Sequence, residues 1–148
     1  LVKVAPEVDG RLLDGLVEAA RAGGWAGFVA TNTTVRREGL RSAGGAEGPP
    51  GGLSGEPLRE PSTRVVAALH RRAPDLPVVG VGGILSAPDA YEKIRAGASL
   101  VEVYTGLVYE GPGFVGRLVE GLARLLARDG FAAVEDAVGI DAARWPEP

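Results

Sequence analysis

Short apolar segments alternate with amphipathic segments along this chain of 148 residues, and no other feature constrains the fold as strongly. The strand-like segments are Leu1–Ala5, Gly27–Thr31, Val78–Val81 and Leu100–Tyr104. The helix-like segments are Gly10–Ala22, Ser62–Arg72, Pro88–Arg95 and Phe114–Arg128, with a shorter one near Val134–Val138. Strands that alternate with helices predict parallel strands joined by helical crossovers. The sequence therefore predicts an α/β domain of four βα units.

Two architectures contain four such units: half of a (β/α)8 TIM barrel and a doubly wound sheet. Polar residues follow each strand-like segment, as in Asn32-Thr33-Thr34. Barrel active sites lie at the carboxyl ends of the strands, so this pattern favours the barrel. We expect residues 1–148 to form four βα units of a barrel, as one domain.

The stretch from Pro77 to Ser86 has the order strand, glycine turn, helix start. Val78–Val81 reads as a strand buried on both faces, and Gly82-Gly83 follow it. Ser86 is a helix N-cap candidate, with Asp89 three residues later. A helix start after a glycine turn favours phosphate binding. The run lacks the last glycine of G-x-G-x-x-G, because position 85 is Leu, so a Rossmann site is rejected.

A second turn of this kind follows Leu100–Tyr104, a segment that also reads as a buried strand. It consists of Thr105-Gly106, and Gly111-Pro112-Gly113 then lead into Phe114–Arg128. Two consecutive βα turns that share a phosphate site are common at the last two strands of a TIM barrel. One apolar face is expected on the last helix, made of Val115, Leu118, Val119, Leu122, Leu125 and Leu126.

Composition excludes several classes of function. With no Cys and one His, the chain offers no thiolate ligand and a poor transition-metal site. A net charge of −3 argues against a nucleic-acid surface. The apolar runs are shorter than a membrane span requires. The chain has no Met and opens directly on a strand, so we expect it to lack an N-terminal part.

A long glycine- and proline-rich segment, Val35–Pro61, shows no helix or strand periodicity. Loops of this length are usually functional or disordered. Its middle, Arg41–Pro50, reads as merely flexible. Its end, Gly51–Leu58, holds an apolar residue and a serine between glycines, which is typical of a functional loop.

Taken together, several segments resemble dihydroorotate dehydrogenases, and specifically the quinone-linked class 2 branch. They occur in family order and are Val2–Pro6, Ala30–Thr34, Gly51–Leu58, Gly80–Ile84, Tyr91–Ile94, Gly97–Val101 and Tyr104–Leu107. The resemblance implies a TIM barrel that carries FMN, of which this chain is the C-terminal half. It also implies that the catalytic base, a serine in this class, lies in the absent first half, so no catalytic residue is expected here.

The resemblance further implies the reaction and the site. Dihydroorotate is oxidised to orotate in pyrimidine biosynthesis, with FMN accepting a hydride and a quinone reoxidising the flavin. The residues implied to bind FMN are Lys3, Thr31, Gly55, Gly82, Gly83, Tyr104 and Thr105, and those implied to bind orotate are Asn32 and Thr33. Quinone binding and peripheral contact with the cytoplasmic side of the membrane are implied for the N-terminal part that is absent here.

Each of these residues also has an ordinary structural interpretation. Lys3 could be a lysine that reaches solvent from a strand end, Asn32 could cap a turn, and Tyr104 could be a core aromatic that offers only its backbone N–H. Outside the implied site, His70 is expected on a solvated helix face. Glu102, between apolar residues, is expected to be a paired structural carboxylate.

Other functions remain open. A class 1 dihydroorotate dehydrogenase, whose base is a cysteine of the absent half, and a dihydropyrimidine dehydrogenase domain would share the FMN barrel. A non-catalytic half-barrel that binds phosphate ligands is the alternative of a different class. Open strand edges at both sides of a half-barrel would favour self-association.

Overall fold

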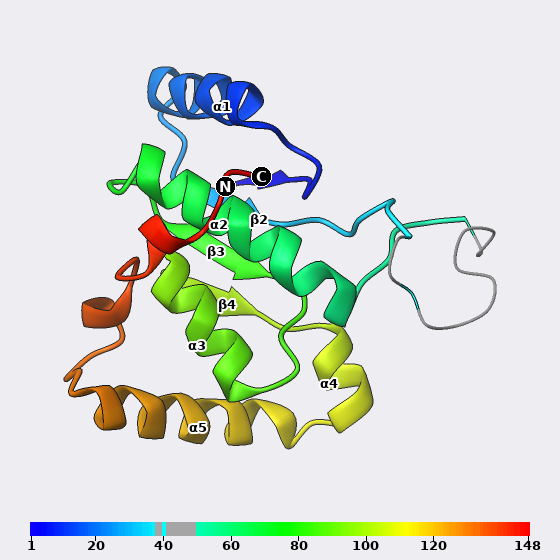
Figure 1. Ribbon diagram of the computed structural model, residues 1–148, viewed down its shortest axis with the longest axis vertical. Coiled ribbons are helices and arrows are strands. Elements are labelled where there is room, and N and C mark those ends of the chain that lie inside the picture. Colours follow the sequence, from blue (N-terminus) through cyan, green and yellow to red (C-terminus); the bar gives the residue numbers. More distant parts are fainter. Residues whose placement is uncertain (38–39, 41–49) are drawn as a thin grey trace.

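The computed structural model describes residues 1–37, 40 and 50–148, and shows a parallel sheet with helices packed against it (Figure 1). The strands are β1 (Val2–Val4), β2 (Phe28–Ala30), β3 (Val78–Val81) and β4 (Leu100–Glu102). The α-helices are α1 (Gly10–Ala22), α2 (Arg59–Arg72), α3 (Ala87–Ala96), α4 (Thr105–Glu110) and α5 (Phe114–Asp129). Three 3-10 turns complete the description: η1 (Glu56–Leu58), η2 (Glu135–Ala137) and η3 (Ala142–Arg144). The expected flexible stretch Arg41–Pro50 falls outside the described residues except for Pro50.

The strands pair in parallel in their sequence order, β1-β2-β3-β4. A doubly wound sheet reverses its strand order at a switch point, and the part of the chain that the structure describes contains no such reversal. Consecutive βα units of a barrel are added in this sequential order. The topology therefore agrees with the barrel interpretation.

Helices cover one face of the sheet. Val4, Phe28 and Val78 point to the helices and are buried in the main core with Val65 and Leu69 of α2. In Figure 1, α2 and α3 lie in front of the strands. On the other face, the register aligns Lys3 with Val29, Val79 and Leu100. Lys3 of β1 and Leu100 of β4 are exposed, so this face of the sheet is uncovered at both edge strands.

Helix α2 begins earlier than the sequence predicted. Arg59–Pro61 falls in the glycine- and proline-rich segment predicted to be a loop, but α2 starts at Arg59. Pro61 is the third residue of the helix, where a backbone N–H has no intrahelical acceptor and its loss costs little. The earlier start brings Arg59 and Ser62 beside the glycine turn that follows β3.

The elements around β4 differ most from expectation. Leu100–Tyr104 was predicted to be a strand buried on both faces, yet β4 is an edge strand and Leu100 is 65% exposed. Helix α4 was not predicted, because its glycine-flanked sequence resembles a turn. Helix α5 packs through Phe114 and Leu118, and two residues expected on its buried face are exposed, namely Val115 and Val119.

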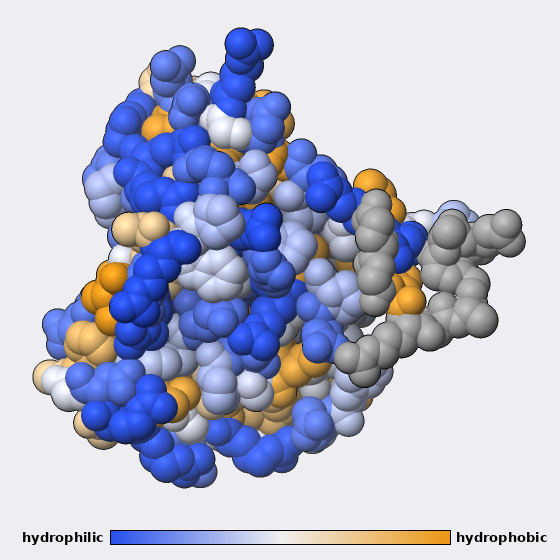
Figure 2. Space-filling model, in the orientation of Figure 1, coloured by the Kyte–Doolittle hydropathy of each residue, from blue (hydrophilic) through white to orange (hydrophobic). Residues whose placement is uncertain are grey.

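The surface reflects this arrangement. In the view of Figure 2, the side that carries α1, α2 and α3 is largely hydrophilic, and hydrophobic surface gathers near α4 and α5. Leu107, Val108 and Tyr109 of α4 are among the exposed apolar residues. No helix in the described residues is both long and apolar enough to cross a membrane.

The C-terminal segment folds back over the end of α2. Arg71 of α2 donates hydrogen bonds to the carbonyl oxygens of Ala142 and Trp145, at 2.5 and 3.1 Å. The expectation that His70 lies on a solvated face is wrong: the side chain is half-buried, and burial lowers its pKa. A Cβ on Gly97 would lie 2.3 Å from the Cβ of His70, and a Cβ on Gly139 would lie 2.0 Å from its Nε2. The backbone at both glycines therefore packs closely against His70. This contact is made by distant segments, so local sequence could not reveal it.

Candidate functional site

A cavity of about 340 Å³ lies at the carboxyl ends of the strands. Its size falls in the range of about 300–1,000 Å³ that is typical of small-molecule sites. Its wall comes from Lys3 of β1, from the ends of β3 and β4, from the turns after β2, β3 and β4, and from the end of the long loop. It contains each of the nine predicted site residues, which are Lys3, Thr31, Asn32, Thr33, Gly55, Gly82, Gly83, Tyr104 and Thr105. Residues that are up to 102 positions apart (3 and 105) therefore meet in one place.

Lys3 supplies the cation of the cavity. It lies in the middle of β1, on the open face of the sheet, opposite Val29 of β2. Glu102 also lines the cavity, and it is exposed. In the described residues Glu102 has no ion-pair partner, so the expectation of a paired structural carboxylate is wrong. The site therefore offers charges of both signs to a ligand.

The Thr31–Thr33 segment supplies most of the polar side chains. The N–H of Thr31 donates to the carbonyl of Val81, and the N–H of Asn32 to that of Val4, which fixes the segment between β1 and β3. Thr31 is buried and its hydroxyl donates to the carbonyl oxygen of Asn32 at 2.8 Å. Asn32 and Thr33 are exposed at the cavity. Their side chains are thus available to a ligand with amide or carboxylate groups.

The end of the long loop closes over this segment. Leu53 and Thr34 exchange two backbone hydrogen bonds of 3.1 and 2.7 Å. A Cβ on Gly52 would lie 1.8 Å from the Thr33 hydroxyl, so the loop can approach only with glycine there. The Thr105 hydroxyl donates to Ser54 Oγ at 2.9 Å. These contacts place Ser54 and Gly55 on the cavity wall, as the glycine-rich pattern indicated.

The Gly82–Gly83 turn lies between the cavity and α2. Both glycines have positive φ, +115° and +69°. A Cβ on Gly83 would lie 2.3 Å from the Cα of Arg59, and one on Gly82 would lie 2.8 Å from a Leu58 methyl. Glycine permits a close approach to the backbone that a side chain would block. The structure shows that contact with η1 and α2 already requires them.

The turn nevertheless presents backbone donors. Within the described residues, the N–H groups of Gly83, Ile84 and Tyr104 have no hydrogen-bond acceptor in the protein. Tyr104 is 75% exposed, so its interpretation as a core aromatic is wrong. Free N–H groups from two neighbouring βα turns form a site that suits an anion such as a phosphate.

Helix α3 contributes less to this site than predicted. Ser86 is its N-cap and accepts a hydrogen bond from the N–H of Asp89, which confirms the expected cap. The Asp89 carboxylate accepts hydrogen bonds from the N–H of Leu85 and from the Ser86 hydroxyl. The chain's own Asp89 carboxylate therefore lies at the start of α3, where an anionic ligand would otherwise bind. The free backbone donors at the cavity come from Gly83, Ile84 and Tyr104.

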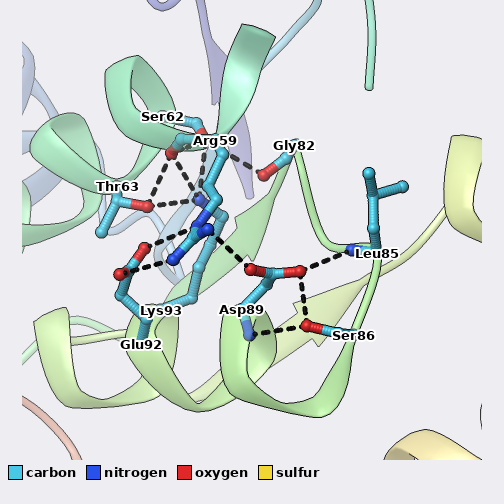
Figure 3. Close-up of polar contacts among 9 residues, drawn as sticks. All are labelled: Arg59, Ser62, Thr63, Gly82, Leu85, Ser86, Asp89, Glu92 and Lys93. Carbon is cyan, nitrogen blue, oxygen red and sulfur yellow. Dashed lines mark hydrogen bonds and ion pairs between the residues drawn. The ribbon is translucent and has the colours of Figure 1, made fainter. Parts of the chain in front are cut away.

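Sequence analysis missed a buried charged cluster behind the turn, drawn in Figure 3. Lys93 of α3 is fully buried and donates to Arg59 O, Ser62 Oγ and Thr63 Oγ1, at 3.1, 2.7 and 2.6 Å. Arg59 forms ion pairs with Asp89 at 3.0 Å and with Glu92 at 2.9 Å. We call these residues, Arg59, Ser62, Thr63, Asp89, Glu92 and Lys93, the α2–α3 cluster.

Two signals in the sequence point to Lys93. It follows Ala90 by three residues and precedes Ile94, so it falls on the apolar face of α3. Gly80 interrupts an otherwise β-branched strand, and a Cβ there would lie 3.1 Å from Lys93 Cδ. Burial lowers the pKa of Lys93 from 10.5 to about 7, and Arg59 adds to this, whereas Glu92 and Asp89 act to raise the pKa.

Comparison with known proteins agrees with the site and the fold. Residues 1–126 match the model of the family described as dihydroorotate dehydrogenase. Dihydroorotate dehydrogenase (quinone) of Anaeromyxobacter dehalogenans strain 2CP-C is 56% identical over 143 residues, which are 95% of this chain and 39% of that protein. The protein of the same name from Halobacterium salinarum is 54% identical over 95% of this chain and 40% of its own length.

Solved structures lead to the same family. The crystal structure of DHODH from Eimeria tenella, in complex with ferulenol, superposes with a TM-score of 0.88 at 39% identity, over 95% of this chain and 37% of that one. The chain thus spans about two fifths of the length of these relatives. The prediction that its four βα units form part of a (β/α)8 barrel is confirmed. Fold, topology and sequence agree that the chain belongs to the dihydroorotate dehydrogenase family.

Proposed function

We propose that this chain supplies the FMN-binding and orotate-binding side of a quinone-linked dihydroorotate dehydrogenase. In this reaction (S)-dihydroorotate is oxidised to orotate in de novo pyrimidine biosynthesis. The observation that carries the proposal is the convergence of nine predicted site residues on one cavity at the carboxyl ends of the strands. The relatives named above carry the quinone-linked name, which favours class 2 over class 1 and over other FMN barrels.

The residues of the cavity fit FMN, whose phosphate is an anion and whose ring system carries polar edges. The free N–H groups of Gly83, Ile84 and Tyr104 would bind the phosphate. Gly55, Thr105 and Thr31 would line the remainder of the cofactor. FMN, when bound, supplies the hydride acceptor of the reaction.

The side chains have distinct proposed tasks. Lys3 would supply a positive charge that stabilises the negative charge of the reduced flavin ring system. Asn32 and Thr33 would orient the amide and carboxylate groups of orotate through hydrogen bonds. The general base that removes the C5 proton is not assigned to any residue of this chain, so we expect a serine outside it to perform that step.

Titration of FMN with the purified chain tests this proposal. Binding quenches flavin fluorescence, so saturable quenching that changes when orotate is added afterwards is the expected result. Quenching that does not saturate would contradict the proposal and would favour a half-barrel without a preformed flavin site. In that case a titration with inorganic phosphate would test the alternative function of a non-catalytic phosphate-binding module.

Substitution of Lys3 by glutamine should weaken flavin binding by about tenfold or more, because a charged hydrogen bond contributes roughly 1.5–3 kcal/mol. Arg11→Gln is the matched control, since Arg11 is an exposed cation of α1 and does not line the cavity. Both variants remove one positive charge. Equal losses of affinity in the two titrations would show that Lys3 acts only through the net charge.

The cellular setting belongs to the same proposal. Peripheral association with the cytoplasmic side of the membrane, and contact with a quinone, are supported by the resemblance to quinone-linked enzymes. They would depend on residues outside this chain. Flotation with lipid vesicles of a longer protein that contains this chain and those residues would measure the association.

A further inference from the structure

The Gly82–Gly83 turn is held on the side opposite the cavity. Ser62 Oγ lies 3.2 Å from the carbonyl oxygen of Gly82, and also contacts the carbonyl oxygens of Leu58 and Arg59, at 2.7 and 3.1 Å. Ser62 is fully buried and does not line the cavity. The same turn packs directly on the backbone of Arg59. Its position therefore depends on the first turn of α2.

Lys93 determines the direction of the Ser62 hydroxyl. An ammonium group has three N–H donors, and three acceptors surround Nζ: Arg59 O, Ser62 Oγ and Thr63 Oγ1. A hydroxyl that accepts from an ammonium must donate its own proton elsewhere. For Ser62 the acceptors within reach are backbone carbonyls, and one of them belongs to Gly82. The one Ser62 proton is thus shared among three carbonyl oxygens, at 2.7 Å (Leu58), 3.1 Å (Arg59) and 3.2 Å (Gly82), and the longest of these contacts links α2 to the turn.

The other end of the turn is held by the same cluster. Asp89 accepts from the N–H of Leu85 at 3.1 Å and pairs with Arg59 at 3.0 Å. Glu92 binds Arg59 through two hydrogen bonds of 3.0 and 2.9 Å. Figure 3 shows these contacts on one side of the chain that runs from Gly82 to Leu85 and Ser86. Two cations and two carboxylates are balanced here, and none of them lines the cavity.

We propose that Ser62 and Lys93 are positioning residues that hold the Gly82–Gly83 turn in the geometry that accepts a phosphate group. The inference rests on the proposed function for the identity of the ligand. It assigns to Ser62 and Lys93 a task beyond packing, because the Ser62 contact restrains a carbonyl whose peptide partner is the N–H of Gly83. That N–H is one of the free donors at the cavity.

Ser62 and Thr63 offer a matched pair of variants. Both hydroxyls are fully buried and both accept from Lys93, but the Thr63 hydroxyl donates to Arg59 O at 2.7 Å and does not contact the turn. Ser62→Ala and Thr63→Val should therefore lower the urea midpoint to a similar extent. Only Ser62→Ala should weaken FMN binding, by about five- to tenfold, the effect of one hydrogen bond. Thr63→Val should remain within about twofold of the unsubstituted chain.

A second measurement needs no flavin. Backbone ¹⁵N relaxation in the flavin-free chain should show that Ser62→Ala lowers the order parameters of Gly82 and Gly83 from about 0.85 towards 0.6. Thr63→Val should leave them unchanged, and Ser62→Thr, which keeps the hydroxyl, should restore them. Equal effects of Ser62→Ala and Thr63→Val, or no effect of Ser62→Ala, would overturn the inference. Absence of FMN binding by the unsubstituted chain would instead refute the proposed function, and the relaxation data would still decide this inference.

Discussion

Gly83→Ala is expected to lower the free energy of unfolding by about 2–5 kcal/mol. The substitution places a Cβ 2.3 Å from the Cα of Arg59, so the backbone of α2 or the turn itself must move. Overpacking of this kind costs about 1–3 kcal/mol. The backbone at Gly83 also has a φ of +69°, a left-handed conformation that costs an L-residue about 1–2 kcal/mol. The two costs add because they act on the same residue of the folded state.

Gly111→Ala separates the two costs. Gly111 has a φ of +72°, and its Cβ would meet nothing within 4 Å. Its ψ of −178° places it in a backbone region that only glycine adopts readily, so alanine should lose the conformational part alone, about 1–3 kcal/mol. Urea denaturation of both variants measures the difference, and flavin titration of Gly83→Ala should show weaker binding. Equal destabilisation of the two variants would mean that α2 does not restrict the turn. If the Gly83→Ala chain fails to fold and the Gly111→Ala chain folds, that outcome also agrees with the prediction.

Stability should rise with pH above neutrality because of Lys93. Burial lowers the pKa of its ammonium in the folded chain to about 7, whereas an unfolded lysine titrates near 10.4. Between these values the unfolded chain binds a proton that the folded chain has lost. Stability then increases with pH by up to about 1.4 kcal/mol per pH unit. Below pH 7 both states are protonated, and Lys93 adds no pH dependence.

Lys93→Met should remove this slope. Urea denaturation from pH 6 to pH 10 gives the curve for each chain, and subtraction of the two curves isolates Lys93 from the tyrosines and the N-terminus. Lys3→Met is the control, because Lys3 is exposed and its substitution should leave the slope in place. Parallel curves for Lys93→Met and the unsubstituted chain would show that the acceptors around Nζ keep the lysine charged. The pKa of Lys93 would then remain above the range measured.

Local sequence signals were sufficient for most elements. Helix α1 has the predicted bounds, Gly10–Ala22, because an Asp9 cap and a glycine pair mark both of its ends. Strand β3 has the predicted bounds as well, since its β-branched run ends at glycine. The apolar face of α5 was overestimated, as the exposure of Val115 and Val119 shows. Periodicity identifies an apolar face and cannot indicate how much of it a neighbouring element covers.

The site was predictable to the extent that it depends on strand ends. Parallel strands bring their carboxyl ends to one edge, so Lys3, Thr31, Gly82 and Thr105 meet there. The support behind the site was not predictable in this way. Arg59 was assigned to a loop, and the contact between Lys93 and Ser62 joins two helices through residues 31 positions apart. Such contacts depend on the register of α2 against α3, which local patterns do not encode.

The free edges of β1 and β4 have a consequence for how the chain behaves in solution. Within the described residues each of these strands pairs on one side only, and Leu100 and Lys3 leave the open face exposed. Any chain that pairs with these edges binds the folded state and not the unfolded one. By mass action it raises the melting temperature in proportion to the logarithm of its concentration. The melting temperature of this chain therefore depends on the concentration of any chain that pairs with these edges, as well as on its own sequence.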